Sequence, residues 1–167
     1  MRPLKDKNYH RMAARAGRET RECRFGHPDR TGRRSWAIPA GHGTYQGLDL
    51  ELLDPDDEDE LTFLLEAQHT ELEDALQRDQ QVTADSEAFS PGLHIAMHQV
   101  VADQLLADDP PETWQTVQRL AGLGYGWHNI AHMISALVSD DIHRAMAEAA
   151  AVRPDDYARR LNALPGD

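Results

Sequence analysis

Two histidine pairs in this chain have the residue type and the spacing that could bind a metal ion. His94 and His98 form one H-x-x-x-H pair, and His128 and His132 form a second. Both pairs lie in segments whose pattern predicts helix, and side chains four residues apart on a helix share one face, about 6 Å apart. Two facing helices of this kind would offer four nitrogen ligands to a single ion.

A fifth imidazole, His69, lies next to Leu65 and Leu72 in an earlier segment that also predicts helix. Neutral imidazole binds zinc at about 2.0–2.1 Å and also suits iron, copper and nickel. We therefore expect a transition metal ion, zinc or iron first, with copper, nickel or manganese as further candidates. The expected ligands are His69, His94, His98, His128 and His132. The alternative is a set of half-buried histidines that are hydrogen-bonded to backbone groups or to acids.

Glu66 precedes His69 by three residues, an E-x-x-H spacing that ferritin-like bundles use at di-iron sites. Such a site needs two copies of the spacing and further carboxylates, whereas this chain has one copy. The pattern therefore favours a nitrogen-rich mononuclear site or an asymmetric two-metal site. Glu66 is a candidate catalytic base, a ligand or a surface acid. An open metal position would make the protein a metal-dependent hydrolase or a di-metal oxidoreductase of unknown substrate.

The elements that must position these histidines are helices. Apolar residues recur at three- and four-residue spacing, which is typical of amphipathic helices. Ser90 and Pro91 predict a helix start, because serine caps the first turn and proline suits its first position. No β-hairpin signal is apparent. The fold class expected is all-α, a small bundle of four to five helices over residues 45–167, with helices near 58–77, 91–107, 111–120, 127–149 and 157–164.

Residues 1–44 are expected to form a basic, largely disordered arm. The first 34 residues carry eleven Lys and Arg against four Asp and Glu, while the whole chain has a formal net charge of −12. A basic arm on an acidic body suggests an alternative function, a non-enzymatic interaction module whose arm contacts nucleic acid or an acidic partner. Because the acidic body repels nucleic acid, this class of partner is disfavoured. A solvated leader that leans on the acidic body is the simpler interpretation.

The remaining composition narrows the location of the protein. Cys23 is the single cysteine, so an internal disulfide and a cysteine-based zinc motif are both excluded. No stretch approaches the roughly 18 apolar residues of a membrane helix. The N-terminal charges are not followed by the apolar core of a secretory signal. We therefore expect a cytoplasmic protein without a membrane partner; the substrate and the oligomeric state stay open.

A resemblance to a known family rests on the histidine motifs themselves. The stretches S-P-G-L-H-I-A-M-H, D-P-P-E, Q-R-L and G-Y-G-W-H-N-I-A-H-M follow one another between residues 90 and 133. Together with the upstream E-A-Q-H-T-E-L, they resemble the uncharacterised bacterial family called domain of unknown function 1841, over about residues 48–164. The family histidines fall on the same five positions, and the resemblance implies no particular activity.

One departure from the family pattern bears on chemistry. Many relatives look like H-E-x-x-H on the fourth helix, which imitates the zinc-protease motif in which the glutamate is the general base. This chain has Asn129 at the second position. A peptidase of that kind is therefore a poor expectation. Ser90 and Thr70 also replace the asparagine and the proline of the family pattern, and we take the serine as an exchange of one helix cap for another.

Overall fold

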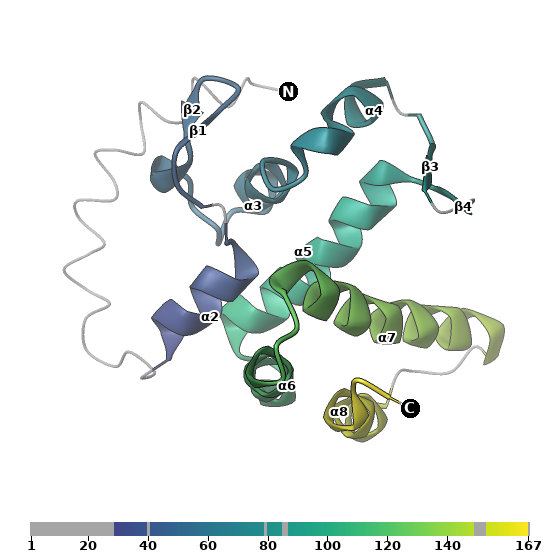
Figure 1. Cartoon of the computed structure of the whole chain (residues 1–167). Coiled ribbons are helices and arrows are strands. Elements are labelled where there is room, and N and C mark those ends of the chain that lie inside the picture. The colour runs from purple at the N-terminus through teal and green to yellow at the C-terminus, as the bar shows by residue number, and fades with distance from the viewer. Residues whose placement is uncertain (1–28, 40, 79, 85–86, 149–152, 167) are drawn as a thin grey trace.

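Helix α5 (Pro91–Ala107) is the central element of the fold and contacts α2, α3, α4, α6 and α7. Figure 1 shows the computed structural model of the chain, in which α5 crosses the molecule between α3 and α6. The structure describes residues 29–39, 41–78, 80–84, 87–148 and 153–166. Both metal-ligand candidates of the first histidine pair lie on α5, so its placement determines where the candidate metal site forms.

Helices dominate the part of the chain that the structure describes, which confirms the all-α class. Their number there, seven α-helices, exceeds the four to five expected. None of these helices is both long enough and apolar enough to span a membrane. The elements are α2 (Arg30–Ala37), β1 (Thr44–Tyr45), β2 (Leu48–Asp49), η1 (Leu50–Leu52), α3 (Glu58–Glu66), η2 (Thr70–Leu72), α4 (Glu73–Arg78), β3 (Val82–Ala84), β4 (Glu87–Phe89), α5, α6 (Pro111–Gly122), α7 (Trp127–Glu148) and α8 (Pro154–Ala163).

The ends of α5 follow from local chemistry. The Ser90 hydroxyl accepts a hydrogen bond from the Leu93 amide at 3.3 Å, and Pro91 occupies the first turn. At the other end Asp108 adopts a left-handed conformation with φ 58°, and its amide bonds to the Gln104 carbonyl. The Ser90 cap fixes the start of the helix and the Asp108 conformation fixes its end, because each satisfies backbone groups that have no partner within the helix.

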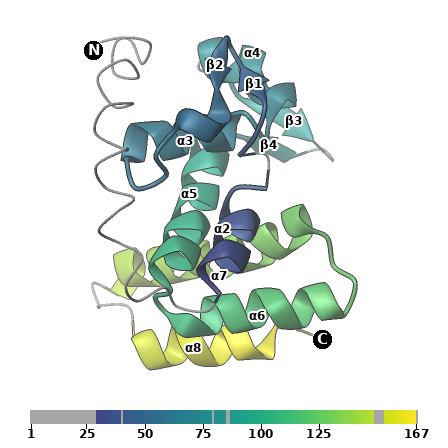
Figure 2. The same ribbon diagram turned by 90° about the vertical axis from the view of Figure 1, so that its left-hand side faces the viewer.

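One apolar core lies between these helices. Its fully buried leucines and isoleucines come from α3, α5, α6, α7 and α8 and from the loop after η1. Burial of each such side chain contributes about 1.5–3 kcal/mol. Figure 2 shows α6 and α8 side by side, where the Thr116 hydroxyl and the Arg119 guanidinium donate to the Leu161 carbonyl at 3.1 and 3.0 Å. The side chains that are less than 2% exposed include Leu53, Leu61, Leu64, Leu65, Leu120, Ile134 and Leu161.

Two short hairpins depart from the expectation that the chain forms no β-structure. Strands β1 and β2 are antiparallel, with Thr44 opposite Asp49 and Tyr45 opposite Leu48. The turn residues Gln46 and Gly47 both have positive φ, 47° and 78°, the geometry that matches the twist of a two-residue hairpin. A Gln-Gly turn is a weaker sequence signal than Asn-Gly, so the sequence alone does not predict this hairpin. Strands β3 and β4 form the second hairpin.

Within residues 1–44, which were expected to form a largely disordered arm, the described part contains a helix. Residues 1–28 lie outside the described residues, but Arg30–Ala37 form α2, which packs on α5. The Arg33 side chain is buried, donates from Nε to the Leu105 carbonyl at 3.0 Å and pairs with Asp108 at 3.2 Å. A basic residue that the sequence suggested for an external partner therefore stabilises the end of α5. Hydropathy does not predict the burial of Arg33, because it counts arginine as polar although its apolar stem can pack in a core.

Replacing Arg33 by methionine should destabilise the protein by about 1–3 kcal/mol, because the Leu105 carbonyl and the Asp108 carboxylate lose a buried donor. Urea unfolding in the presence of a chelator measures this difference without a contribution from metal. The matched control is Arg78→Ala, which removes the exposed Arg78–Asp74 pair on α4 and should cost less than about 0.5 kcal/mol. Equal, small effects of the two changes would contradict the role given to Arg33.

Candidate metal centre

Five imidazole rings from three parts of the chain meet at one place, between α5, the start of α7 and the segment that links α3 to η2. Four of them offer nitrogens that all lie within 4.8 Å of one another: His69, His94, His98 and His128. The fifth, His132, has its ring centroid 4.2 Å from that of His128 and 5.0 Å from that of His94. The structure thus brings together every histidine that the sequence singled out as a ligand.

A break in the first predicted helix places His69. The expected continuous helix 58–77 ends at Glu66 and restarts at Glu73, with η2 between the two parts. In an unbroken helix the Leu65 carbonyl would accept the His69 amide. Here the His69 amide donates to the Glu66 carbonyl at 2.9 Å, and the His69 ring donates from Nδ1 to the Leu65 carbonyl at 2.9 Å. The His69 ring thus takes the place of the His69 amide at the Leu65 carbonyl, which also accepts the Gln68 amide at 3.0 Å, and the ring turns into the protein.

This hydrogen bond also determines which nitrogen of His69 is available. A carbonyl can only accept, so Nδ1 carries the proton and the neutral ring presents a lone pair at Nε2. That Nε2 lies 3.3 Å from Nε2 of His128. In a tetrahedral zinc site with bonds of about 2.0–2.1 Å, neighbouring ligand nitrogens are about 3.3 Å apart. Two of the nitrogens therefore already have the separation that a shared ion requires.

His98 provides a second sign that the cluster is incomplete by itself. Its side chain is 3% exposed, and its Nε2 has no hydrogen-bond partner among the described residues. An unsatisfied buried polar atom costs about 1–3 kcal/mol. A metal ion bonded to this nitrogen would remove that cost, whereas a purely structural histidine would be expected to have found a donor or an acceptor.

Burial favours the neutral form of four of the rings, those of His94, His98, His128 and His132. Loss of hydration, followed by repulsion from the neighbouring imidazoles, lowers the pKa of His94 to about 4 and that of His98 to about 2. Burial lowers the pKa of His128 and of His132 as well. A metal binds the deprotonated ring, so these shifts reduce competition from protons at neutral pH.

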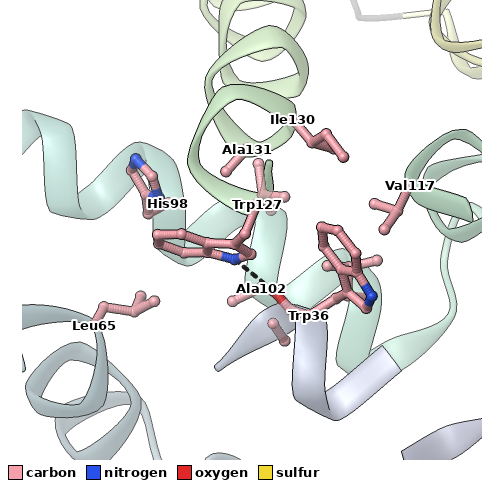
Figure 3. Close-up of a pocket in the computed structure, with 11 residues that line it drawn as sticks. Trp36, Leu65, His98, Ala102, Val117, Trp127, Ile130 and Ala131 are labelled. Carbon is pink, nitrogen blue, oxygen red and sulfur yellow. Dashed lines mark hydrogen bonds between the residues drawn. The ribbon is translucent and has the colours of Figure 1, made fainter. Parts of the chain in front are cut away.

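Trp127 forms an aromatic wall behind the cluster. Its ring stacks on His128 with an interplanar angle of 10° and lies 5.6 Å from the His98 ring. Figure 3 shows the Trp127 indole between His98 and Trp36, with its N–H donated to the Trp36 carbonyl at 2.7 Å. A small cavity of about 10 Å³ lies among these residues and is lined mainly by apolar groups. The wall therefore excludes water on one side of the rings.

The two sides of the cluster differ in exposure. His69 and His98 are buried at 1% and 3% exposure, whereas His128 and His132, on α7, are exposed and His94 is intermediate. An ion between them would have a buried floor and a side that faces solvent. This difference separates the site from a fully enclosed structural centre.

Glu66 is not part of the nitrogen group. Its pKa is raised by burial and by the neighbouring Glu73 carboxylate, and its charge also raises the pKa of Tyr45. The helix break explains this placement, because Glu66 ends α3 while His69 lies beyond the helix, so the two do not share a helix face. The sequence pattern predicts neither the helix break nor the hydrogen bond between the His69 ring and the Leu65 carbonyl. The family-like E-x-x-H spacing gave no sign of either.

Comparison with known proteins identifies the family. A family model described as Domain of unknown function (DUF1841) matches residues 57–163. The chain therefore belongs to this family, as the resemblance implied. The match includes all five histidines and every helix from α3 to α8. Neither a curated protein nor a solved structure matches the chain significantly.

Without metal, the protein should lose stability as the pH falls below about 6.5. The folded pKa of His98 and His94 lies below the ordinary value of 6.5. As the pH falls, the unfolded chain therefore takes up protons first, which lowers its free energy relative to that of the folded state. The stability that depends on these rings is complete above pH 6.5 and declines as the pH approaches 4. Urea unfolding between pH 7 and 4.5 measures the slope.

His98→Phe is the informative comparison, because it keeps an aromatic ring and cannot titrate. Its stability should fall less steeply with decreasing pH than that of the wild type. His143→Ala, at an exposed position, should keep the wild-type slope. Parallel pH profiles for His98→Phe and the wild type would contradict the assigned burial of a neutral His98.

Proposed function

We propose that this protein is a helical metalloprotein that binds a divalent transition-metal ion, zinc or iron in the first place, at the histidine cluster. The ion is held by nitrogens of His69, His94, His98 and His128, with His132 at its solvent side. The convergence of these four nitrogens within 4.8 Å is the observation that carries the proposal.

The competing interpretation is a packed group of histidines that serve one another and the backbone. It accounts for His69, which bonds the Leu65 carbonyl. It does not account for His98, whose buried Nε2 has no partner among the described residues. Binding of a cation would give this buried nitrogen a partner.

The donor set limits the choice of metal. Imidazole nitrogens suit zinc, iron, copper and nickel, whereas magnesium, calcium and manganese prefer oxygen ligands. Carboxylates of the described residues do not join the nitrogen group, so the two-metal centre that would include Glu66 is the weaker hypothesis. A single zinc or iron ion fits the donors best.

The solvent-facing side of the cluster supports an enzymatic function. An ion with an open position acts as a Lewis acid and lowers the pKa of bound water toward 7, which serves hydrolysis if the ion is zinc. An iron or copper ion in the same place would serve oxidation. A metal-dependent hydrolase or oxidoreductase is therefore the proposed class, with the substrate unassigned.

The alternative, an interaction module with a basic arm, receives less support. Among the described arginines of the arm, Arg33 already donates to the Leu105 carbonyl and forms an ion pair with Asp108. Its charge is therefore not available to an external partner. We also expect the protein to act in the cytoplasm, because a chain with one cysteine suits a reducing compartment.

Elemental analysis of protein purified without a histidine tag tests metal binding. We expect about one equivalent of zinc or iron, and a lower melting temperature after chelation, because a ligand at 100 times its Kd stabilises by about 2.7 kcal/mol. His98→Ala should lower metal affinity by at least about 10–100-fold, the loss that even outer-shell changes cause.

His143→Ala and His42→Ala are the matched controls, since both positions are exposed. Each removes an imidazole and should leave metal content and the effect of chelation unchanged. Metal-free protein whose stability does not respond to added zinc or iron would contradict the proposal.

A further inference from the structure

The donor atoms of the candidate metal centre carry no charge. The group of close ligand atoms consists of four histidines, and no Asp or Glu among the described residues joins it. The carboxylate whose charge acts on His128 belongs to Glu71, which is exposed to solvent and raises the His128 pKa only as a minor contribution. A divalent ion bound here would keep its full double positive charge.

The surroundings do little to neutralise that charge. The floor of the site is formed by buried His69 and His98 and by the apolar side of Trp127. In such a medium an unbalanced charge interacts strongly with any counter-charge at short distance, because water does not screen it as bulk solvent would. The bound ion is often the largest local charge in a site and dominates its chemistry.

The geometry leaves one direction from which a counter-charge can approach. His69 and His98 close the inner side, while His128 and His132 are exposed on the first turns of α7. His132 lies outside the four-nitrogen group but contacts it, with ring centroids 4.2 Å from His128 and 5.2 Å from His98. Its ring lines the outer side of the site without being needed as a ligand.

We propose that the metal centre binds a small anion directly to the ion, in the open position on the side of His128 and His132. This inference rests on the proposed metal binding and adds the class of exogenous ligand. His132 is a positioning residue, whose ring N–H donates a hydrogen bond to the bound anion. Small monoanions such as bicarbonate, a short carboxylate or azide suit this position, because each offers a donor atom to the ion and an acceptor to the His132 N–H.

A tetrahedral ion bound by the same four histidines alone is the rival arrangement, whereas a five-coordinate ion would keep a fifth position for the anion. The tetrahedral arrangement would leave no free position, and the doubly charged ion would then be neutralised only by distant carboxylates of the acidic body. That body also repels anions at long range, but salt screens charges separated by more than about 8–10 Å. A direct bond to the ion, at about 2 Å, is not weakened in this way. The open arrangement is therefore consistent with the acidic composition.

Cobalt(II) loaded into the full-length protein makes the coordination visible, because its d–d absorption responds to coordination number and to ligand type. Titration with azide, and separately with bicarbonate, should change the spectrum in a saturable manner. His132→Ala should bind cobalt as the wild type does but weaken azide binding by about tenfold, the effect of one hydrogen bond to a charged group. His143→Ala should match the wild type throughout.

The outcomes separate the two proposals. If cobalt and zinc fail to bind the wild type, the proposed metal function itself is overturned. If cobalt binds and the spectrum stays constant up to high azide and bicarbonate concentration, only the anion position is overturned. If His132→Ala loses cobalt, His132 is a ligand and its assigned positioning role is wrong. An unchanged azide affinity in His132→Ala, with cobalt retained, also overturns that role.

Discussion

The hydrogen bond from the His69 ring to the Leu65 carbonyl is the interaction on which the rest of the site depends. It orients the ring just beyond the end of α3, with Nε2 directed at His128, 3.3 Å from the His128 Nε2. Without this bond, a continuous helix would keep His69 in register with Glu66 on one face, as in a di-iron bundle. With it, His69 lies against the two histidine pairs on α5 and α7, and the donor set consists of imidazoles. One change in backbone hydrogen bonding thus changes the donor atoms that gather at the proposed metal site.

The two helical pairs were predictable, because i,i+4 spacing is a property of the helix itself. Ser90, Pro91 and Asp108 define the ends of α5 by local chemistry, and local chemistry can be read from sequence. The sequence alone does not show that α5 and α7 face each other. The described structure confirms that their histidines meet.

The features that escaped prediction depend on particular side-chain contacts, near or far along the chain. The buried Arg33 has partners that are 72 and 75 positions away in the chain, Leu105 and Asp108. The break at His69 has no proline or glycine to mark it, and there the Leu65 carbonyl accepts from the His69 ring and the Gln68 amide rather than from the His69 amide. The stacking of Trp127 on His128 likewise follows from the way α7 begins. Periodicity describes one element at a time and carries no information about such pairings.

X-ray absorption spectroscopy of the metal-loaded protein tests the central claim most directly, because it reports the atoms bound to the ion. We predict an edge spectrum and fine structure dominated by about four nitrogen scatterers near 2.0–2.1 Å, with the multiple-scattering pattern of imidazole rings. A first shell of carboxylate and water oxygens without imidazole features would contradict the account, even if the metal content were stoichiometric.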